Sequence, residues 1–262
     1  MRNTCKLFLM TVLLSFSIVT VAQDGSNIKV LTFNIYHGET MNGDYNLDLI
    51  ADVIKSADPD FVLLQEVDYK TNRSGKIDLA TVLGCKTKML PLFARAMYFD
   101  GGEYGDAILS KYSFIKTRNV SLPNTEGHEP RAAVEVTVEL NNGDTVSVIC
   151  THLDYTEDNT NRIMQTDKII KSFSRNKYPT LLAGDFNAQP GSVTIKKITE
   201  YWTPSYGENP EPTFPSNNPQ KKIDYVFYSP KNKWKVLKTK VIRDSVASDH
   251  CAYLVELNYL IL

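Results

Sequence analysis

Side chains that can do chemistry recur in this chain beside runs of apolar residues. They are Asn34, Glu66, His152, Asp154, Asp185, Asn187, Asp249 and His250. All but the last two follow an apolar run, and Asp249 and His250 precede the final one. Carboxylates can hold a hard cation, and histidines can transfer protons. Because the ends of neighbouring strands converge at one edge of a sheet, we expect these groups to share one cleft.

The spacing of Asp185 and Asn187 adds to this expectation. Residues two apart present their side chains to the same side of an extended backbone. A solvated loop explains any one of the polar residues, but it does not easily explain all of them in the same kind of position. The pattern therefore predicts an active site at the strand ends.

Six short motifs occur in the order Thr-Phe-Asn34-Ile, Leu-Gln-Glu66-Val, Thr-His152-Leu-Asp, Gly-Asp185-Phe-Asn187, Ile-Asp224-Tyr-Val and Ser-Asp249-His250. Together they resemble the endonuclease/exonuclease/phosphatase superfamily, which includes pancreatic-type deoxyribonuclease, apurinic endonucleases, neutral sphingomyelinases and inositol-polyphosphate phosphatases. The resemblance extends over about residues 28 to 257. Each motif is weak alone, but six in order are a specific signal.

The resemblance implies a role for each matching residue. Glu66 is the expected principal metal ligand, with Asn34 and Asp249 close to it. The residues expected to act in catalysis are His152, Asp185, Asn187, Asp224 and His250. Arg131 and Arg73 are the expected phosphate or substrate contacts. Phosphate-ester hydrolysis needs positive charge on the phosphoryl oxygens, and Mg²⁺ or Mn²⁺ held by oxygen ligands supplies it.

Three further residues are left without a settled role. Asp106 stands where many members of the superfamily carry a neutral residue, and it can either orient His152 or recruit a second ion. His37 and His128 match no chemical motif, and we expect them to face solvent in loops.

The elements that position these groups follow from the apolar pattern. Residues 28–33 and 61–64 form continuous apolar runs typical of buried strands. Between them, Leu47, Ile50 and Ile54 recur at helical spacing, and Asp58-Pro59 ends the helix. Further strands are expected at 107–109, 132–140, 146–150, 180–183, 223–228, 235–242 and 252–257, with helices near 163–173 and after Gly191.

Strands outnumber the helices in this arrangement, and both faces of the sheets need cover. The predicted fold class is α/β, a four-layer sandwich of two mixed β-sheets flanked by helices. A doubly wound Rossmann sheet is the alternative, but no G-x-G-x-x-G follows the first strand.

The first 22 residues have the layout of a secretory signal peptide. Arg2 and Lys6 precede an apolar run from Leu7 to Val19, and small residues lead to Ala22. The run is shorter than the roughly 20 residues that span a bilayer. We therefore expect an exported protein, periplasmic or secreted, with one domain over residues 23–262. Its mature amino terminus is then Gln23, and mass spectrometry of exported protein that still contains Leu7 to Val19 would indicate an uncleaved anchor instead.

Composition bears on the partners. The net charge of −1 becomes −3 without residues 1–22, which carry two positive and no negative charges. Proteins that bind nucleic acid usually have a basic surplus, so nucleic acid is possible but not favoured. Three cysteines remain, and Cys150 and Cys251 lie in apolar runs, which favours buried free thiols over a disulfide.

Three functions remain open at this point. The favoured one is an exported metal-dependent hydrolase of small or lipid-linked phosphate esters, monomeric and without a stable membrane span after processing. The second is a secreted nuclease, which exposed basic residues around Tyr69 to Lys76 would support. The third is a non-catalytic binding module, which the intact set of acidic residues and histidines disfavours.

Overall fold

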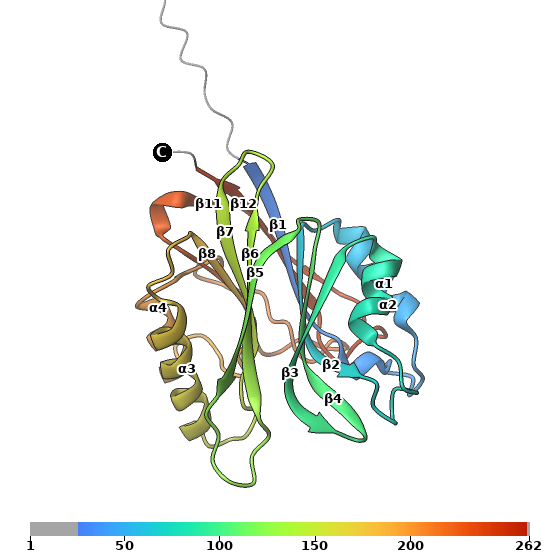
Figure 1. The fold of residues 1–262 in the computed structure, drawn as a ribbon. Coiled ribbons are helices and arrows are strands. Elements are labelled where there is room, and N and C mark those ends of the chain that lie inside the picture. Colours follow the sequence, from blue (N-terminus) through green and yellow to red (C-terminus); the bar gives the residue numbers. More distant parts are fainter. Residues whose placement is uncertain (1–25, 261–262) are drawn as a thin grey trace, which may run out of the picture.

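Two six-stranded sheets pack face to face in a computed structural model that describes residues 26–260 (Figure 1). In spatial order, the first sheet contains β11 (Trp234–Ile242), β12 (Ala252–Tyr259), β1 (Ser26–Asn34), β2 (Phe61–Tyr69), β4 (Gly102–Ser110) and β3 (Leu90–Phe99). The second sheet contains β5 (Phe114–Leu122), β6 (Arg131–Glu139), β7 (Thr145–His152), β8 (Thr180–Asp185), β10 (Asp224–Ser229) and β9 (Thr203–Pro204). The predicted signal peptide lies outside the described residues.

Both sheets are mixed. The pairs β1–β2 and β7–β8 are parallel, and the remaining neighbours are antiparallel. Helices α1 (Leu47–Ala57) and α2 (Leu79–Thr87) lie outside the first sheet, and α3 (Thr160–Phe173) and α4 (Val193–Thr199) lie outside the second (Figure 1). Two single 3₁₀ turns, η1 (Tyr36–Gly38) and η2 (Lys231–Lys233), complete the elements. The predicted four-layer sandwich is confirmed.

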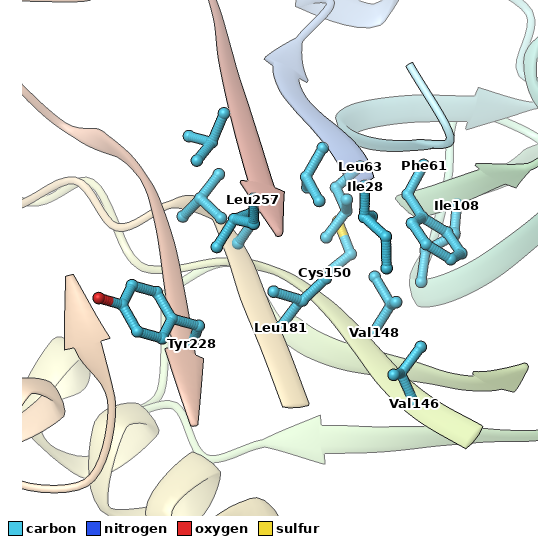
Figure 2. Close-up of a cluster of buried hydrophobic side chains, with 14 of the residues drawn as sticks. Ile28, Phe61, Leu63, Ile108, Val146, Val148, Cys150, Leu181, Tyr228 and Leu257 are labelled. Atoms are coloured by element: carbon cyan, nitrogen blue, oxygen red, sulfur yellow. The ribbon is translucent and has the colours of Figure 1, made fainter. Parts of the chain in front are cut away.

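The main hydrophobic core fills the space between the sheets. Ile28, Phe61 and Leu63 from the first sheet meet Val148 and Leu181 from the second, and all are fully buried (Figure 2). Burying a side chain of this size stabilises the fold by about 1.5–3 kcal/mol. This core fixes the separation of the sheets, so it also fixes the distance between residues carried by different sheets.

The helix between the first two strands forms as its spacing predicts. The Asn46 side chain caps α1 by accepting from the backbone N–H of Asp48 at 3.1 Å. The helix ends where Asp58 adopts a left-handed conformation (φ 46°), directly before Pro59. Ile50 and Ile54 pack into the core beneath the helix.

Helix α2, the strands β3, β5 and β9 and the two 3₁₀ turns were not predicted. Helix α2 buries Leu79 and Leu83 but has a glycine in its interior at Gly84, so its apolar pattern is weak. Strand β5 is an edge strand with mostly exposed polar residues, and β3 is also an edge strand that is only partly buried. Strand β5 lacks an apolar pattern because most of its side chains are exposed.

The described residues contain no helix that is long and apolar enough to cross a membrane.

Candidate active site

A cavity of about 780 Å³ opens at one end of the sandwich and receives side chains from both sheets. Eight of the ten predicted site residues line it: Glu66, Arg73, Arg131, His152, Asp185, Asn187, Asp249 and His250. The other two, Asn34 and Asp224, are buried and hydrogen-bonded to residues of the lining. The structure therefore brings all ten predicted residues together at one place.

Asn34 joins the two halves of the site. Its side-chain nitrogen donates to Glu66 Oε1 at 3.0 Å in the first sheet and to Asp185 Oδ2 at 3.3 Å in the second. Its side-chain oxygen accepts from the backbone N–H of Tyr36 at 3.1 Å. The sequence predicted Asn34 close to the metal ligand Glu66, and the Asn34 amide contacts the Glu66 carboxylate directly. Asn34 thus acts here as a donor that positions both carboxylates.

Glu66 projects from an irregularity in β2. The register between β2 and β4 shifts between Leu64 and Val67, and Glu66 itself adopts a left-handed conformation with φ 58°. The strand continues past Glu66 instead of ending there, so a bulge aims the carboxylate into the cavity. Burial disfavours the charged form, but neighbouring polar groups, His37 and Asn34 among them, outweigh it and lower the pKa of Glu66 to about 2.

A second carboxylate, Asp249, faces the same cavity. Burial raises the pKa of Asp249, and the negative charge of Glu66 raises it further, although His250 opposes the shift. Two acids that repel each other at the wall of one cavity are a fitting donor set for a divalent cation, which would remove the repulsion. Glu66 and Asp249 therefore suit the role that the sequence predicted for them.

Another compact group of ligand-type atoms belongs to Asp185, Asp224 and His250, and these atoms lie within 4.8 Å of one another. His250 Nδ1 lies 3.1 Å from Asp224 Oδ2 and 3.2 Å from Oδ1, so both partners are already used in a hydrogen-bonded pair. His250 Nε2 faces Asp185 Oδ2 at 3.6 Å. We interpret the group as a proton-handling pair beside an acid, not as a metal cage.

The charge of His250 follows from this position. Burial disfavours its protonation, but the carboxylates of Asp224 and Asp185 outweigh burial and raise the pKa of His250 to about 10. Asp185 is itself completely enclosed, and burial raises its pKa to about 7, with Asp224 adding to the shift and His250 opposing it. At neutral pH the site therefore holds an imidazolium next to an acid that is poised to exchange a proton.

His152 has the opposite character. Its Nδ1 lies 2.7 Å from Nη1 of Arg131, and since a guanidinium can only donate, Nδ1 accepts. Burial, together with the positive charge of Arg131, holds the pKa of His152 well below its usual range. The neutral ring then carries its proton on Nε2, which faces Asp185 Oδ2 at 3.4 Å. The Nδ2 of Asn187 lies 3.0 Å from the same Nε2, so Asn187 and His152 are in direct contact.

Asn187 is fixed by its own contacts. Its side-chain nitrogen donates to the carbonyl of Leu153 at 3.0 Å, and its backbone N–H donates to Asp185 Oδ1 at 2.8 Å. The residue has a left-handed backbone, with φ 46°. This turn places the amide of Asn187 beside His152, and it leaves Asp185 Oδ2 as the carboxylate oxygen that faces the histidines.

The two predicted arginines are less free than we expected. Arg131 is only 4% exposed, and its Nη1 also contacts Glu129 Oε1 at 3.1 Å. Arg73 makes a two-pronged contact with the buried Asp68, through Nε and Nη2 at 2.8 Å each. Both guanidiniums line the cavity, but each has an acidic partner, so they add little uncompensated positive charge.

Asp106 lies in β4 and is buried. Burial raises the pKa of Asp106 well above its usual range, and the positive charge of Arg131 works against that shift. The positive charge of Arg131 therefore acts on both Asp106 and His152.

Two buried polar residues, His37 and Lys222, were missed in the sequence analysis. His37 was expected to face solvent, which is wrong, because it is 8% exposed and lines the cavity beside Glu66.

Lys222 was not considered in the sequence analysis. Its buried Nζ has no hydrogen-bond partner among the described residues and lies 3.2 Å from the ring centre of Tyr253. Burial lowers the pKa of Lys222 to about 7, although Asp224 and Glu211 oppose the shift. Neither position carries a local sequence signal for burial, since tertiary packing alone encloses it.

Comparisons with known proteins identify a matching family and similar folds. The model of the Endonuclease/Exonuclease/phosphatase family matches residues 31–250. No curated protein gives a significant match.

Several solved structures share the fold. The endonuclease/exonuclease/phosphatase from Beutenbergia cavernae is 22% identical, with 89% of this chain and 72% of that chain covered and a TM-score of 0.74. A functionally unknown conserved protein from Enterococcus faecalis is 25% identical, with 89% and 100% covered and a TM-score of 0.74. The mannosyl-6-phosphatase from Bacteroides thetaiotaomicron is 18% identical, with 88% and 100% covered and a TM-score of 0.71.

Proposed function

The chain belongs to the endonuclease/exonuclease/phosphatase family, and we propose that it is a divalent-metal-dependent hydrolase acting on a small or lipid-linked phosphate ester. The observation that carries the proposal is the junction at Asn34. The Asn34 side chain contacts Glu66, the candidate metal ligand of the first sheet, at 3.0 Å. It also contacts Asp185, the candidate general base of the second sheet, at 3.3 Å. A reaction that needs both kinds of acid can take place where they meet.

Each residue of the site has its own role in the proposed hydrolysis. Glu66 and Asp249 would hold Mg²⁺ or Mn²⁺, which when bound neutralises charge on the phosphoryl oxygens. Asp185 orients the attacking water and accepts its proton, because burial raises the pKa of this carboxyl to about 7 and makes its carboxylate a stronger base. Asp224 keeps His250 charged and in place. The imidazolium of His250 and the Nε2–H of His152 bind the phosphoryl oxygens as charge develops, and Asn187 lies against His152.

A small substrate is favoured over nucleic acid by the state of the cations. Arg73 and Arg131 are paired with acids. Arg162 and Lys221 also line the cavity, and Arg162 keeps its positive charge because its partners are the neutral backbone carbonyls of Asp154, Thr156 and Glu157. A nucleic-acid backbone needs several free positive side chains along its path. In the segment from Tyr69 to Lys76, where exposed basic residues would support a nuclease, Arg73 is bound to Asp68, whereas Lys70 and Lys76 are exposed. A nuclease therefore stays the alternative that the substrate panel has to test.

A substrate panel tests the proposal. We expect hydrolysis of bis-nitrophenyl phosphate, nitrophenyl phosphate, sphingomyelin or mannose 6-phosphate in Mg²⁺ or Mn²⁺, with loss of activity in EDTA and recovery when metal is restored. DNA and RNA, assayed in parallel, should be poor substrates. Full turnover in the chelator would contradict metal dependence. Hydrolysis of nucleic acid alone would establish the secreted nuclease instead. If the protein hydrolysed no substrate of the panel, the non-catalytic binding module would be the remaining function.

A further inference from the structure

His37 lies beside the main candidate metal ligand without an assigned role. It belongs to the turn η1, directly after β1, and its side chain is 11% exposed. The ring lines the cavity together with Glu66, and its Nδ1 lies 3.7 Å from Glu66 Oε2. The ring of Tyr36 packs against the imidazole with ring centres 4.5 Å apart, and the ring centre of Tyr45 lies 6.2 Å from that of His37. The imidazole is therefore enclosed and held in one orientation.

The two ring nitrogens of His37 have different surroundings. Nε2 lies 3.1 Å from Glu39 Oε2, and because an ionised carboxylate can only accept, Nε2 carries a proton. Nδ1 is buried and has no hydrogen-bond partner among the described residues. Its 3.7 Å separation from Glu66 Oε2 is too long for a hydrogen bond. Most buried side-chain polar atoms in proteins have a hydrogen-bond partner, so the unpartnered Nδ1 is an exception that a bound ligand would explain.

The backbone on both sides of this contact is held in an uncommon conformation. Tyr36, His37 and Glu66 all adopt left-handed conformations, with φ of 46°, 45° and 58°. Residues other than glycine rarely adopt such angles, and each costs of order 1–3 kcal/mol. Conformations of this kind cluster at functional sites. Here they direct the His37 ring and the Glu66 carboxylate toward each other.

We propose that Nδ1 of His37 is a further ligand of the divalent cation at Glu66, with Glu39 holding the opposite ring N–H. A histidine that binds a metal ion typically donates its other N–H to a carboxylate, which is the arrangement of Glu39 and His37. The inference rests on the proposed metal-dependent function. It also narrows the choice of ion, because Mg²⁺ prefers oxygen ligands, whereas imidazole nitrogen suits first-row transition ions. A nitrogen ligand therefore favours Mn²⁺ over Mg²⁺.

Pulsed electron paramagnetic resonance of the Mn²⁺-loaded protein tests this ligand directly, without substrate. We expect the wild-type spectrum to show coupling to a directly coordinated ¹⁴N nucleus and the His37→Asn variant to lack it. Asparagine is chosen because it tolerates the left-handed backbone at position 37 better than most residues. The matched control is His128→Asn, since His128 lies outside the cavity lining and contacts Asp154 at 3.1 Å. The control should keep the coupling.

Calorimetric titration with Mn²⁺ and Mg²⁺ provides the second measurement. We expect His37→Asn and Glu39→Gln each to weaken Mn²⁺ binding by about tenfold or more, and to weaken Mg²⁺ binding less. Glu39→Gln leaves the His37 backbone unchanged, so it keeps the test valid if His37→Asn fails to fold by circular dichroism.

The outcomes separate this inference from the proposed function. Mn²⁺ binding without nitrogen coupling in the wild type, or coupling that persists in His37→Asn, would overturn the role of His37 and leave the hydrolase proposal standing. A wild-type protein that binds neither ion would overturn metal dependence itself.

Discussion

Replacing Asp185 by asparagine, or His250 by glutamine, is expected to lower kcat by about two to four orders of magnitude, the usual contribution of acid–base or electrostatic catalysis. Asp185 is the acid whose Oδ2 faces both histidines, at 3.4 Å and 3.6 Å. Asparagine keeps an oxygen for the Asn187 backbone N–H but cannot accept a proton from water. Steady-state kinetics on the best substrate of the panel measures the effect.

Stability should fall much less than activity in these variants. Asp185→Asn places an NH₂ group where Oδ2 faces the donors of Asn34 and the histidines, so the melting temperature should fall, but the loss of kcat should far exceed any loss of folded protein. The matched control is Asp167→Asn, since Asp167 is an exposed acid on α3 that pairs with Lys197 at 2.7 Å. Wild-type turnover per folded molecule in Asp185→Asn and His250→Gln would show that the assigned site is wrong. Large losses of stability with proportionate losses of activity would indicate a structural cluster.

The same residue predicts a pH dependence. Because burial raises the pKa of Asp185 to about 7, the carboxylate that accepts a proton is fully present only above that pH. We therefore expect kcat/KM to rise with pH up to about 7 and to fall by about tenfold per pH unit well below it. Asp167→Asn should show the same profile. A rate that stays constant between pH 5 and pH 8 would contradict the role of Asp185 as the base.

The second large effect is expected at Glu66. Glu66→Gln removes the negative charge of the main candidate ligand, so activity at a fixed, limiting metal concentration should fall by about two to three orders of magnitude, as expected for loss of several kcal/mol of metal-derived stabilisation. Unlike the loss in Asp185→Asn, this loss should be partly recovered at high Mg²⁺ or Mn²⁺. Metal titration by calorimetry and by activity measures both parts of the effect.

Glu103→Gln is the matched control for this variant. Glu103 lies in β4 of the same sheet but pairs with Arg95 at 2.7 Å and is not part of the cavity lining. It should bind metal and turn over substrate like the wild type. If Glu66→Gln kept the wild-type metal affinity, or if its loss of activity were the same at every metal concentration, Glu66 would not be a ligand.

A large part of this protein could be predicted from the sequence by itself, for local reasons. Strands such as β1 and β2 are buried on both faces, so their residues form continuous apolar runs that remain visible without a partner. Helix α1 carries its own cap, apolar face and termination signal. The site residues were found because each lies in a short motif, and the six motifs occur in the order typical of the family.

Other features depend on contacts between distant segments, which only the tertiary structure decided. Asn34 and Asp185 are 151 positions apart and meet because the core between the sheets sets their separation. The pairing of Arg73 with Asp68 and of Arg131 with Glu129 removed the free positive charge that both arginines had in the sequence-based interpretation. His37 was misjudged for the same reason. Its loop is polar in sequence, but the left-handed turn after β1 and the bulge at Glu66 enclose it, because burial and unmet hydrogen bonds are properties of the packed chain and not of any one segment.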